Sequence, residues 1–413
     1  MAHHAAAQTT VPADRFVDSV GVNVHLHYDR TVYRDNFPLV QTRLTDMKVR
    51  HVRDGLIDTT WQGYYDRHNA LGALGIKGLF IASPGQSTEL LQSYPSRMAG
   101  SFEGYEAPNE HDKSNDLNWV ATLRASLTRL RALRNTPALA AFPIHGPSLT
   151  HETSYAALGD VSALIDIGNL HNYFGGHHPG TPGWGDNGYG SIDWNLRLVR
   201  SISGSKPITT TETGYWNQLR VGSVPLDVAG KYMPRLLLEQ FRKGIGRTYL
   251  YELADYTQAG GGVTSDYGIL NADGSPKPAY TAVKSLLTML HDPGAAFPAV
   301  PLSYNVVGGS ATLRHMAFQK RTGTYFLAIW VEDAGYNVDS RVVSAAASQN
   351  VTVTIASNFR HVATHRWQAN GTVASSAASA ASSIPVQVTD TLMMLEFQAG
   401  GPTPPSNVRI VPY

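Results

Sequence analysis

Short apolar runs rich in β-branched and aromatic residues alternate with helix-like segments from residue 20 to about residue 255. Runs of this length and composition predict strands. The helix-like segments include residues 117–135 and 226–243, and apolar residues recur at helical spacing in the second. The eight predicted strands are 20–28, 49–55, 76–83, 101–109, 139–146, 166–174, 206–214 and 247–255.

This alternation predicts an α/β fold, a (β/α)8 TIM barrel whose last helix follows Lys277. A doubly wound open sheet is the alternative. No glycine-rich phosphate loop follows the first predicted strand, which disfavours the open sheet.

The pattern changes at about Asp292, after which strand-like runs are separated by Gly, Ser, Ala and Asn, without a helical pattern. We therefore predict a C-terminal antiparallel β-sandwich domain. The Ala/Ser-rich segment 373–385 is expected to be a loop, whereas 326–333 is expected to be a core strand. The predicted divisions are an N-terminal extension or added residues at 1–14, the barrel at 15–291, the sandwich at 292–400 and a tail at 401–413.

The composition excludes several classes of function. The chain has 413 residues, of which 42% are hydrophobic and 16% charged, and its formal net charge is +1. Without a basic stripe, neither nucleic acid nor an anionic membrane is an expected partner. No apolar run approaches the roughly 18 residues of a membrane span. The absence of cysteine excludes disulfides, thiolate catalysis and sulfur-ligated metals.

The chain start, MAHHAAAQTT, lacks the basic and apolar regions of a signal peptide. Low charge and an abundance of Gly, Ser, Thr and Tyr are typical of exported bacterial proteins. We expect a secreted or periplasmic protein whose leader is absent from this chain. The oligomeric state stays open.

The candidate chemistry lies at the predicted strand ends, where (β/α)8 barrels hold their active sites. The fourth strand ends at Asn109-Glu110 and the seventh carries Glu212 at its tip. Either glutamate alone is explained as a polar residue ending a strand. The pair, facing across the barrel mouth, is what a retaining glycosidase requires, with carboxyl groups roughly 5–5.5 Å apart.

In these residues the chain resembles the clan A glycoside hydrolases. The resemblance covers about residues 15–290 and rests on Asn109-Glu110, His171-x-Tyr173 and Glu212. It implies that Glu110 is the acid/base and Glu212 the nucleophile of a retaining enzyme acting on oligo- or polysaccharides. No cofactor and no metal are implied.

The resemblance also assigns supporting roles. Asn109 would bind the sugar 2-hydroxyl, Tyr173 would hydrogen-bond the nucleophile, and His171 would face the same pocket. Arg53, at the end of the second strand, would keep Glu212 ionised. Burial and the charge of Glu212 would raise the pKa of Glu110, which predicts a bell-shaped pH profile.

Two departures concern the substrate more than the reaction. His111 follows the acid/base glutamate, where many clan members have Pro, and Tyr251 with Glu252 ends the eighth strand, where many have Trp. The added sandwich and the segment Lys277–Tyr280 most resemble the family 39-like branch.

Aromatic residues are expected to line the sugar pocket. The long glycine-rich segment 171–190 carries Trp184 and is predicted to form a subsite wall. Trp216, Tyr251 and His25 are further candidates for substrate binding. For Trp216, packing under the loop is the alternative, and His25 is equally well explained as a buried, satisfied histidine.

Two other functions stay open at this point. A metal-dependent amidohydrolase-like enzyme would use imidazole and carboxylate ligands at the strand ends. The second is a non-catalytic carbohydrate-binding protein, and the presence of both glutamates disfavours this function. The ligands of the metal enzyme would be His25, His27, His145, His171 and Asp255. Sugar identity, ring form, anomeric configuration and endo or exo action are not determined by the sequence.

Overall fold

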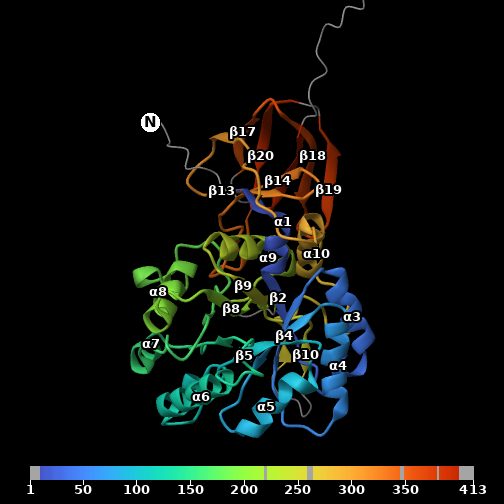
Figure 1. Ribbon diagram of the computed structural model, residues 1–413. Coiled ribbons are helices and arrows are strands. Elements are labelled where there is room, and N and C mark those ends of the chain that lie inside the picture. Colours follow the sequence, from blue (N-terminus) through green and yellow to red (C-terminus); the bar gives the residue numbers. More distant parts are fainter. Residues whose placement is uncertain (1–9, 218–220, 258–263, 345–347, 379–380, 400–413) are drawn as a thin grey trace, which may run out of the picture.

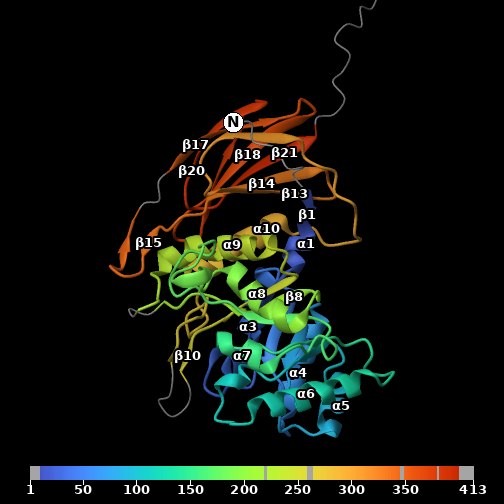
Figure 2. The same ribbon diagram turned by 90° about the vertical axis from the view of Figure 1, so that its left-hand side faces the viewer.

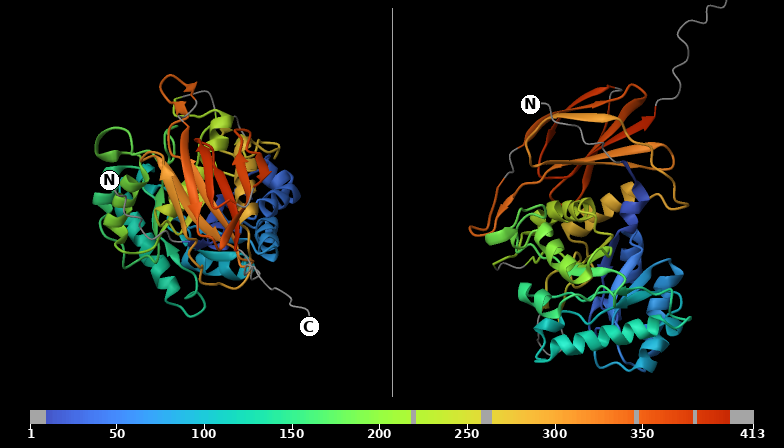
Figure 3. Two further views of the ribbon diagram at one scale, coloured as in Figure 1. Left: turned by 90° about the horizontal axis from the view of Figure 1, so that it is seen from above. Right: turned by 60° about the vertical axis from the view of Figure 1, so that its left-hand side comes forward.

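The computed structural model describes residues 10–217, 221–257, 264–344, 348–378 and 381–399. A parallel barrel lies below a β-sandwich, with helices α9 and α10 between them (Figure 1). Seen from two further directions, the sandwich is a layer stacked on one side of the barrel (Figure 3). The predicted tail, 401–413, and the first nine residues of the predicted extension lie outside the described residues.

The barrel sheet has eight parallel strands in the order β6-β5-β4-β3-β2-β9-β8-β7. A parallel bridge between His145 and Ile167 joins the two ends of this order. The predicted barrel is therefore confirmed, and the doubly wound sheet is excluded. The strands are β2 (Val20–Asn23), β3 (His51–Gly55), β4 (Lys77–Ile81), β5 (Phe102–Glu106), β6 (Ile144–His145), β7 (Gly168–His171), β8 (Ile208–Thr213) and β9 (Arg247–Leu250).

Helices follow most of these strands and cover the outside of the barrel (Figure 1). Asn36 caps α3 by accepting a hydrogen bond from the Leu39 amide, and Ser191 caps α8 through the Trp194 amide. The helices are α1 (Ala13–Asp18), α2 (Val32–Asp35), α3 (Phe37–Asp46), α4 (Gln62–Ala73), α5 (Thr88–Arg97), α6 (Trp119–Arg134), α7 (Glu152–Leu158), α8 (Ile192–Ser203), α9 (Leu226–Arg242) and α10 (Pro278–Leu290). Among these described helices, none combines the length and apolarity that a bilayer crossing requires.

The sandwich consists of a six-stranded sheet in the order β1-β13-β14-β21-β18-β19 and a three-stranded sheet in the order β12-β17-β20. Alternate residues of both sheets meet in a separate apolar core. The strands are β1 (Thr10–Pro12), β12 (Tyr304–Gly308), β13 (Leu313–Gln319), β14 (Thr324–Val331), β17 (Gln349–Ile355), β18 (Phe359–Trp367), β19 (Val373–Ala377), β20 (Ser383–Val388) and β21 (Met393–Ala399). Residues 10–12 of the predicted N-terminal extension thus belong to the sandwich sheet, through parallel pairing with β13.

Two small hairpins complete the described structure. They consist of β10 (Tyr256–Thr257) with β11 (Thr264–Ser265), and β15 (Tyr336–Asn337) with β16 (Val342–Val343). The second hairpin extends from the sandwich toward the barrel loops (Figure 2).

The expected loop at 373–385 is wrong in part, because β19 and the start of β20 lie within it. Pairing with β18 organises β19 although Ala and Ser favour strands weakly. The expectation for residues 326–333 is confirmed at β14, whose residues from Tyr325 to Val331 are buried.

Candidate functional site

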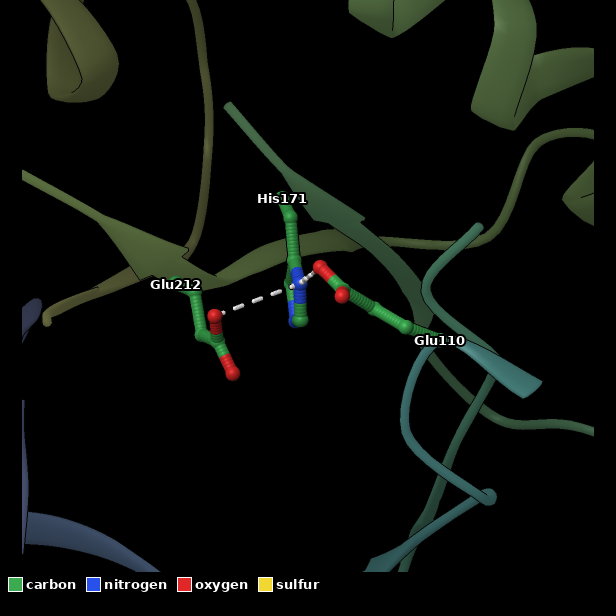
Figure 4. A group of neighbouring side chains, drawn as sticks. All are labelled: Glu110, His171 and Glu212. Carbon is green, nitrogen blue, oxygen red and sulfur yellow. Dashed lines mark hydrogen bonds and ion pairs between the residues drawn. The ribbon is translucent and has the colours of Figure 1, made fainter. Parts of the chain in front are cut away.

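The two predicted glutamates lie at the same end of the barrel and point toward each other (Figure 4). Glu212 is part of β8, whereas Glu110 lies beyond the end of β5, just before a 3-10 turn at His111–Lys113. The predicted strand 101–109 therefore extends too far. Glu110 has φ of 42° and ψ of 40°, a left-handed conformation that is uncommon for residues other than glycine. This turn directs its side chain back across the barrel mouth.

His171, at the end of β7, lies between the two carboxylates (Figure 4). Its Nδ1 is 2.8 Å from Glu110 Oε1 and 3.5 Å from Glu212 Oε2. Its Nε2 is 3.1 Å from the hydroxyl of Thr211, which fixes the ring. One polar atom from each of Glu110, His171 and Glu212 lies within 4.8 Å of the others.

Both oxygens of Glu212 have further partners. Arg53 donates from Nη1 to Oε1 at 2.7 Å, and the Tyr173 hydroxyl donates to Oε2 at 2.9 Å. The contacts expected of Arg53 and Tyr173 with Glu212 are therefore present. Together they hold the carboxylate of Glu212 in a single orientation within a buried environment.

Arg53 also binds a second carboxylate, Glu106, that the sequence did not single out. Its Nε and Nη2 donate to Glu106 at 2.6 and 2.7 Å, which forms a two-point ion pair inside the barrel. Further hydrogen bonds join Arg53 to Asn23 and Asn109 at 2.8 and 2.7 Å. Burial lowers the pKa of Arg53, but the charges and hydrogen bonds of Glu106 and Glu212 raise this pKa by a larger amount, so the net shift is upward. The positive charge is thus shared by two carboxylates.

Glu106 is completely buried and accepts further hydrogen bonds from Asn169 and Thr211 at 3.0 and 3.2 Å. A sequence signal for it exists in retrospect. A buried arginine requires a buried counter-charge, and Glu106 ends the same strand that leads to Glu110.

The expected rise in the pKa of Glu110 is wrong. Burial does raise this pKa, but the hydrogen bond and charge of His171 lower it, assisted by Lys113 and Arg53, and the net shift is downward. The sequence-based expectation counted the repulsion by Glu212 and did not include an imidazole in direct contact with the carboxyl group.

An aromatic cluster lies beside Glu212. Trp216 stacks on Tyr267 with ring centroids 5.5 Å apart, and Tyr267 meets Tyr173 and Tyr251 edge-on at 5.4 and 5.7 Å. The structure thus brings together three predicted residues, Tyr173, Trp216 and Tyr251, through Tyr267. Tyr267 was not predicted, because it lies in a loop beyond β11 with no pattern of its own.

Trp184 lies on the other side of the site, next to Glu110. A pocket of about 170 Å³ is lined by Trp184 together with Glu110, His171 and Tyr173, and by residues of α7 and α8. The Trp184 ring stacks on His177 with centroids 4.5 Å apart. The predicted wall from segment 171–190 therefore lies where a ligand would meet the acid/base candidate.

His25 lies further from the two glutamates. It stacks on Tyr28 at 4.4 Å, and its Nε2 is 2.9 Å from Glu252. Its connection to the site is an edge contact with Tyr251 at 5.8 Å. His25 thus faces a carboxylate outside the pair of glutamates, and its contact with a substrate stays a prediction.

The five ligands of the amidohydrolase alternative do not converge. His27 faces Asp54 at 3.6 Å, and Asp255 binds Lys277 at 2.7 Å. His145 is buried inside the barrel, and this burial lowers its pKa to about 4. Within the described ranges, Glu110, His171 and Glu212 form the one group with the composition and spacing to hold a metal ion. The proposed ligand set of the alternative is therefore wrong.

Solved structures provide a match for this arrangement of barrel and sandwich. The fold is similar to that of a family 39 glycoside hydrolase. That protein comes from the gut symbiont Bacteroides cellulosilyticus WH2 and is 14% identical, and the match has a TM-score of 0.61 over 94% of this chain and 83% of that chain. At this identity the match shows the shared fold alone.

Two further matches have lower TM-scores. A GH2 β-galacturonidase from Eisenbergiella tayi is 13% identical, with a TM-score of 0.48 over 70% of this chain and 53% of its own. A β-glucuronidase from Parabacteroides merdae is 11% identical, with a TM-score of 0.46 over 92% of this chain and 58% of its own. No protein family model and no curated protein sequence matches this chain.

Proposed function

We propose that this protein is a retaining glycoside hydrolase that cleaves O-glycosidic bonds of an oligo- or polysaccharide. The observation that carries the proposal is the pair of carboxylates from β8 and the β5 loop, which have oxygens within 4.8 Å of each other. Inverting enzymes keep their carboxyl groups roughly 6.5–9.5 Å apart to admit a water molecule. Such a close approach of two carboxylate oxygens is expected of a retaining pair, whose carboxyl groups lie roughly 5–5.5 Å apart, and supports direct attack by one carboxylate.

In the first step, Glu212 attacks the anomeric carbon while Glu110 transfers its proton to the leaving oxygen. The glycosidic C–O bond breaks and a glycosyl ester of Glu212 forms. Arg53 and Tyr173, which bind the two oxygens of Glu212, orient the attacking carboxylate. In the second step, Glu110 takes a proton from water, whose oxygen displaces Glu212 from the sugar.

His171 supplies the link between the two steps. Its Nδ1 hydrogen-bonds Glu110 at 2.8 Å, so a proton can reside on either the imidazole or the carboxyl group. The lowered pKa keeps Glu110 ionised in the free site, which is the protonation state that the second step requires. When substrate fills the site, exclusion of water raises the pKa of the acid.

The test is a screen of aryl glycosides and of plant and microbial polysaccharides with wild type, Glu212→Ala and Glu110→Ala. We expect wild type to release sugar with retained configuration, observed by NMR of the first product. Glu212→Ala should lose several orders of magnitude in kcat, and Glu110→Ala about 10²–10⁴-fold on substrates with poor leaving groups. Glu89→Ala, which removes an exposed glutamate on α5 outside the pocket, is the matched control.

The same samples separate the other functions. Activity that survives Glu212→Ala and is abolished by EDTA would show a metal-dependent reaction that does not use Glu212, and would overturn the proposal. Sugar binding without hydrolysis in wild type would indicate a carbohydrate-binding protein. A secreted or periplasmic location suits a polysaccharide substrate and stays a prediction.

A further inference from the structure

The loop between β7 and α8, residues 172–191, is held by a residue of the other domain. Glu332 lies directly after β14 in the sandwich and is 2% exposed. His178 Nδ1 is 2.7 Å from its Oε1, and the Gly180 amide donates to the same oxygen at 2.9 Å. Two points of the loop thus converge on one buried carboxylate.

The carboxylate is itself rigidly fixed. Arg235 of α9 donates to both of its oxygens, at 3.1 and 2.5 Å, and the Trp330 indole donates to Oε2 at 2.8 Å. Burial raises the pKa of Glu332, but Arg235 and His178 lower it well below its usual range. A charged, fully bonded carboxylate in a buried site permits few alternative positions of its partners.

Close packing adds to the hydrogen bonds. A Cβ atom at Gly180 would lie 2.2 Å from Glu332 Cγ, so a larger residue there would displace either the loop or the carboxylate. On the other side of the loop, a Cβ at Gly176 would lie 3.3 Å from Val338, in the hairpin of β15 and β16. This hairpin reaches down from the sandwich beside the barrel loops (Figure 2).

The residues that Glu332 anchors, His178 and Gly180, are joined to the proposed substrate pocket through His177 and Trp184. His177 precedes His178 and carries the Trp184 ring on its own ring, with an interplanar angle of 17°. The Tyr215 hydroxyl donates to the His177 carbonyl at 2.9 Å, which holds this point against the strand that carries Glu212. Trp184 then lines the pocket beside Glu110.

We propose that Glu332 is a positioning residue, through which the β-sandwich fixes the 172–191 loop and places Trp184 for substrate binding. The sandwich thereby determines the shape of the pocket without contacting the substrate. The effect on kinetics rests on the proposed glycosidase function, whereas the effect on the loop does not.

The test uses Glu332→Gln and Gly180→Ala in the full chain, with Asp390→Asn as the matched control. Asp390 pairs with Lys231 of α9 at 3.1 Å in the same interface, and that ion pair leaves the loop untouched. On the substrate found in the screen, both test variants should raise KM about tenfold, as loss of a well-placed aromatic contact implies, with kcat within about twofold of wild type. Asp390→Asn should leave both parameters unchanged.

A second measurement, hydrogen exchange, does not depend on enzymatic activity. Hydrogen exchange of peptides from 173–190 should become faster in Glu332→Gln and Gly180→Ala and should not change in Asp390→Asn. Faster exchange in a protein that hydrolyses no glycoside would leave the positioning role standing and reject the glycosidase. Unchanged exchange and unchanged KM in an active enzyme would reject the positioning role.

A double-mutant cycle assigns the effect to the contact itself. Gly180→Ala should raise KM in wild type but have little further effect in Glu332→Ala, where the clashing carboxylate is gone. Equal effects in both backgrounds would overturn the proposal. Because Glu332→Ala leaves Arg235 without its counter-charge and can unfold the protein, the single variants Glu332→Gln and Gly180→Ala carry the test independently.

Discussion

The hydrogen bond between His171 and Glu110 couples the protonation of these two residues. Burial raises the pKa of the Glu110 carboxyl group, but this hydrogen bond and the charges of His171, Lys113 and Arg53 together lower it by more. As the proposed general acid, Glu110 must carry a proton for the first step. The alkaline limb of the rate profile should therefore report this pKa.

Replacing His171 tests this coupling. In His171→Ala the hydrogen bond and positive charge are gone, so the pKa of Glu110 should rise. The protonated acid then persists to higher pH, and the alkaline limb of kcat/KM should move upward. The measurement is the pH dependence of kcat/KM on a substrate with a poor leaving group.

His365→Ala is the control for this variant, because His365 also pairs with a glutamate, Glu396 at 3.1 Å, but in the sandwich sheet outside the pocket. Its profile should match wild type. An unchanged or downward-shifted alkaline limb in His171→Ala would show that Glu110 is not the acid or that His171 does not carry the charge.

Three contacts at this scale follow from sequence reasoning, and one does not. Arg53 and Tyr173 bind Glu212 and His171 faces the same pocket, as expected, because residues at barrel strand ends have a defined direction. Glu106 was not predicted, because it binds Arg53 inside the barrel and does not face the pocket. A glutamate in a strand is not by itself a sign of burial, and the signal lay in its partner Arg53, for which the sequence predicted a contact with Glu212 alone.

At the level of elements, α9 decides how barrel and sandwich meet. Most of its residues are buried, including Arg235 and Glu239, because the barrel covers one side and the sandwich the other (Figure 1). Its helical pattern was visible in the sequence. The burial of its second side was not visible in the sequence, because that side carries polar residues whose partners lie in the sandwich.

Gly230 lies where the sandwich approaches α9 closely. A Cβ at this position would lie 2.4 Å from the Ala369 carbonyl oxygen, in the turn between β18 and β19. In an exposed helix, Gly→Ala stabilises by about 1 kcal/mol. Here we expect Gly230→Ala to lower the free energy of unfolding by about 1 kcal/mol or more, because overpacking outweighs propensity.

Urea unfolding of Gly230→Ala measures this effect, with Gly85→Ala as control. A Cβ at Gly85 meets no atom within 4 Å, so its stability should stay within about 0.5 kcal/mol of wild type. A stabilised Gly230→Ala variant would contradict the close contact of the turn with α9.

In the whole molecule, the apolar core of the barrel continues into the sandwich. Phe318, Trp330 and Trp367 of the sandwich belong to the same buried cluster as the barrel residues. Phe16 and Phe318 have ring centroids 5.5 Å apart, and the Trp367 indole donates to the Ala282 carbonyl at 3.1 Å. The buried pair of Arg235 and Glu332 crosses the same boundary.

This continuity predicts cooperative unfolding of the two domains. Differential scanning calorimetry should give one transition, because separating the domains would expose apolar side chains and leave Arg235 and Glu332 buried without partners. Reheating tests whether the transition is reversible. Two separate transitions would show that the domains fold independently despite the shared core.

The sequence by itself determined the order of strands and helices, the barrel, the sandwich and the placement of Glu110 and Glu212 at one end of the barrel. These features follow from local hydrophobic patterns and from the geometry of a (β/α)8 barrel. Only the tertiary structure decided the partners of the buried charges. Glu332 and its partners Arg235 and His178 are 97 and 154 positions apart in the chain. Local patterns carry no information about such pairs, because a buried charge is satisfied by whichever group the fold brings beside it.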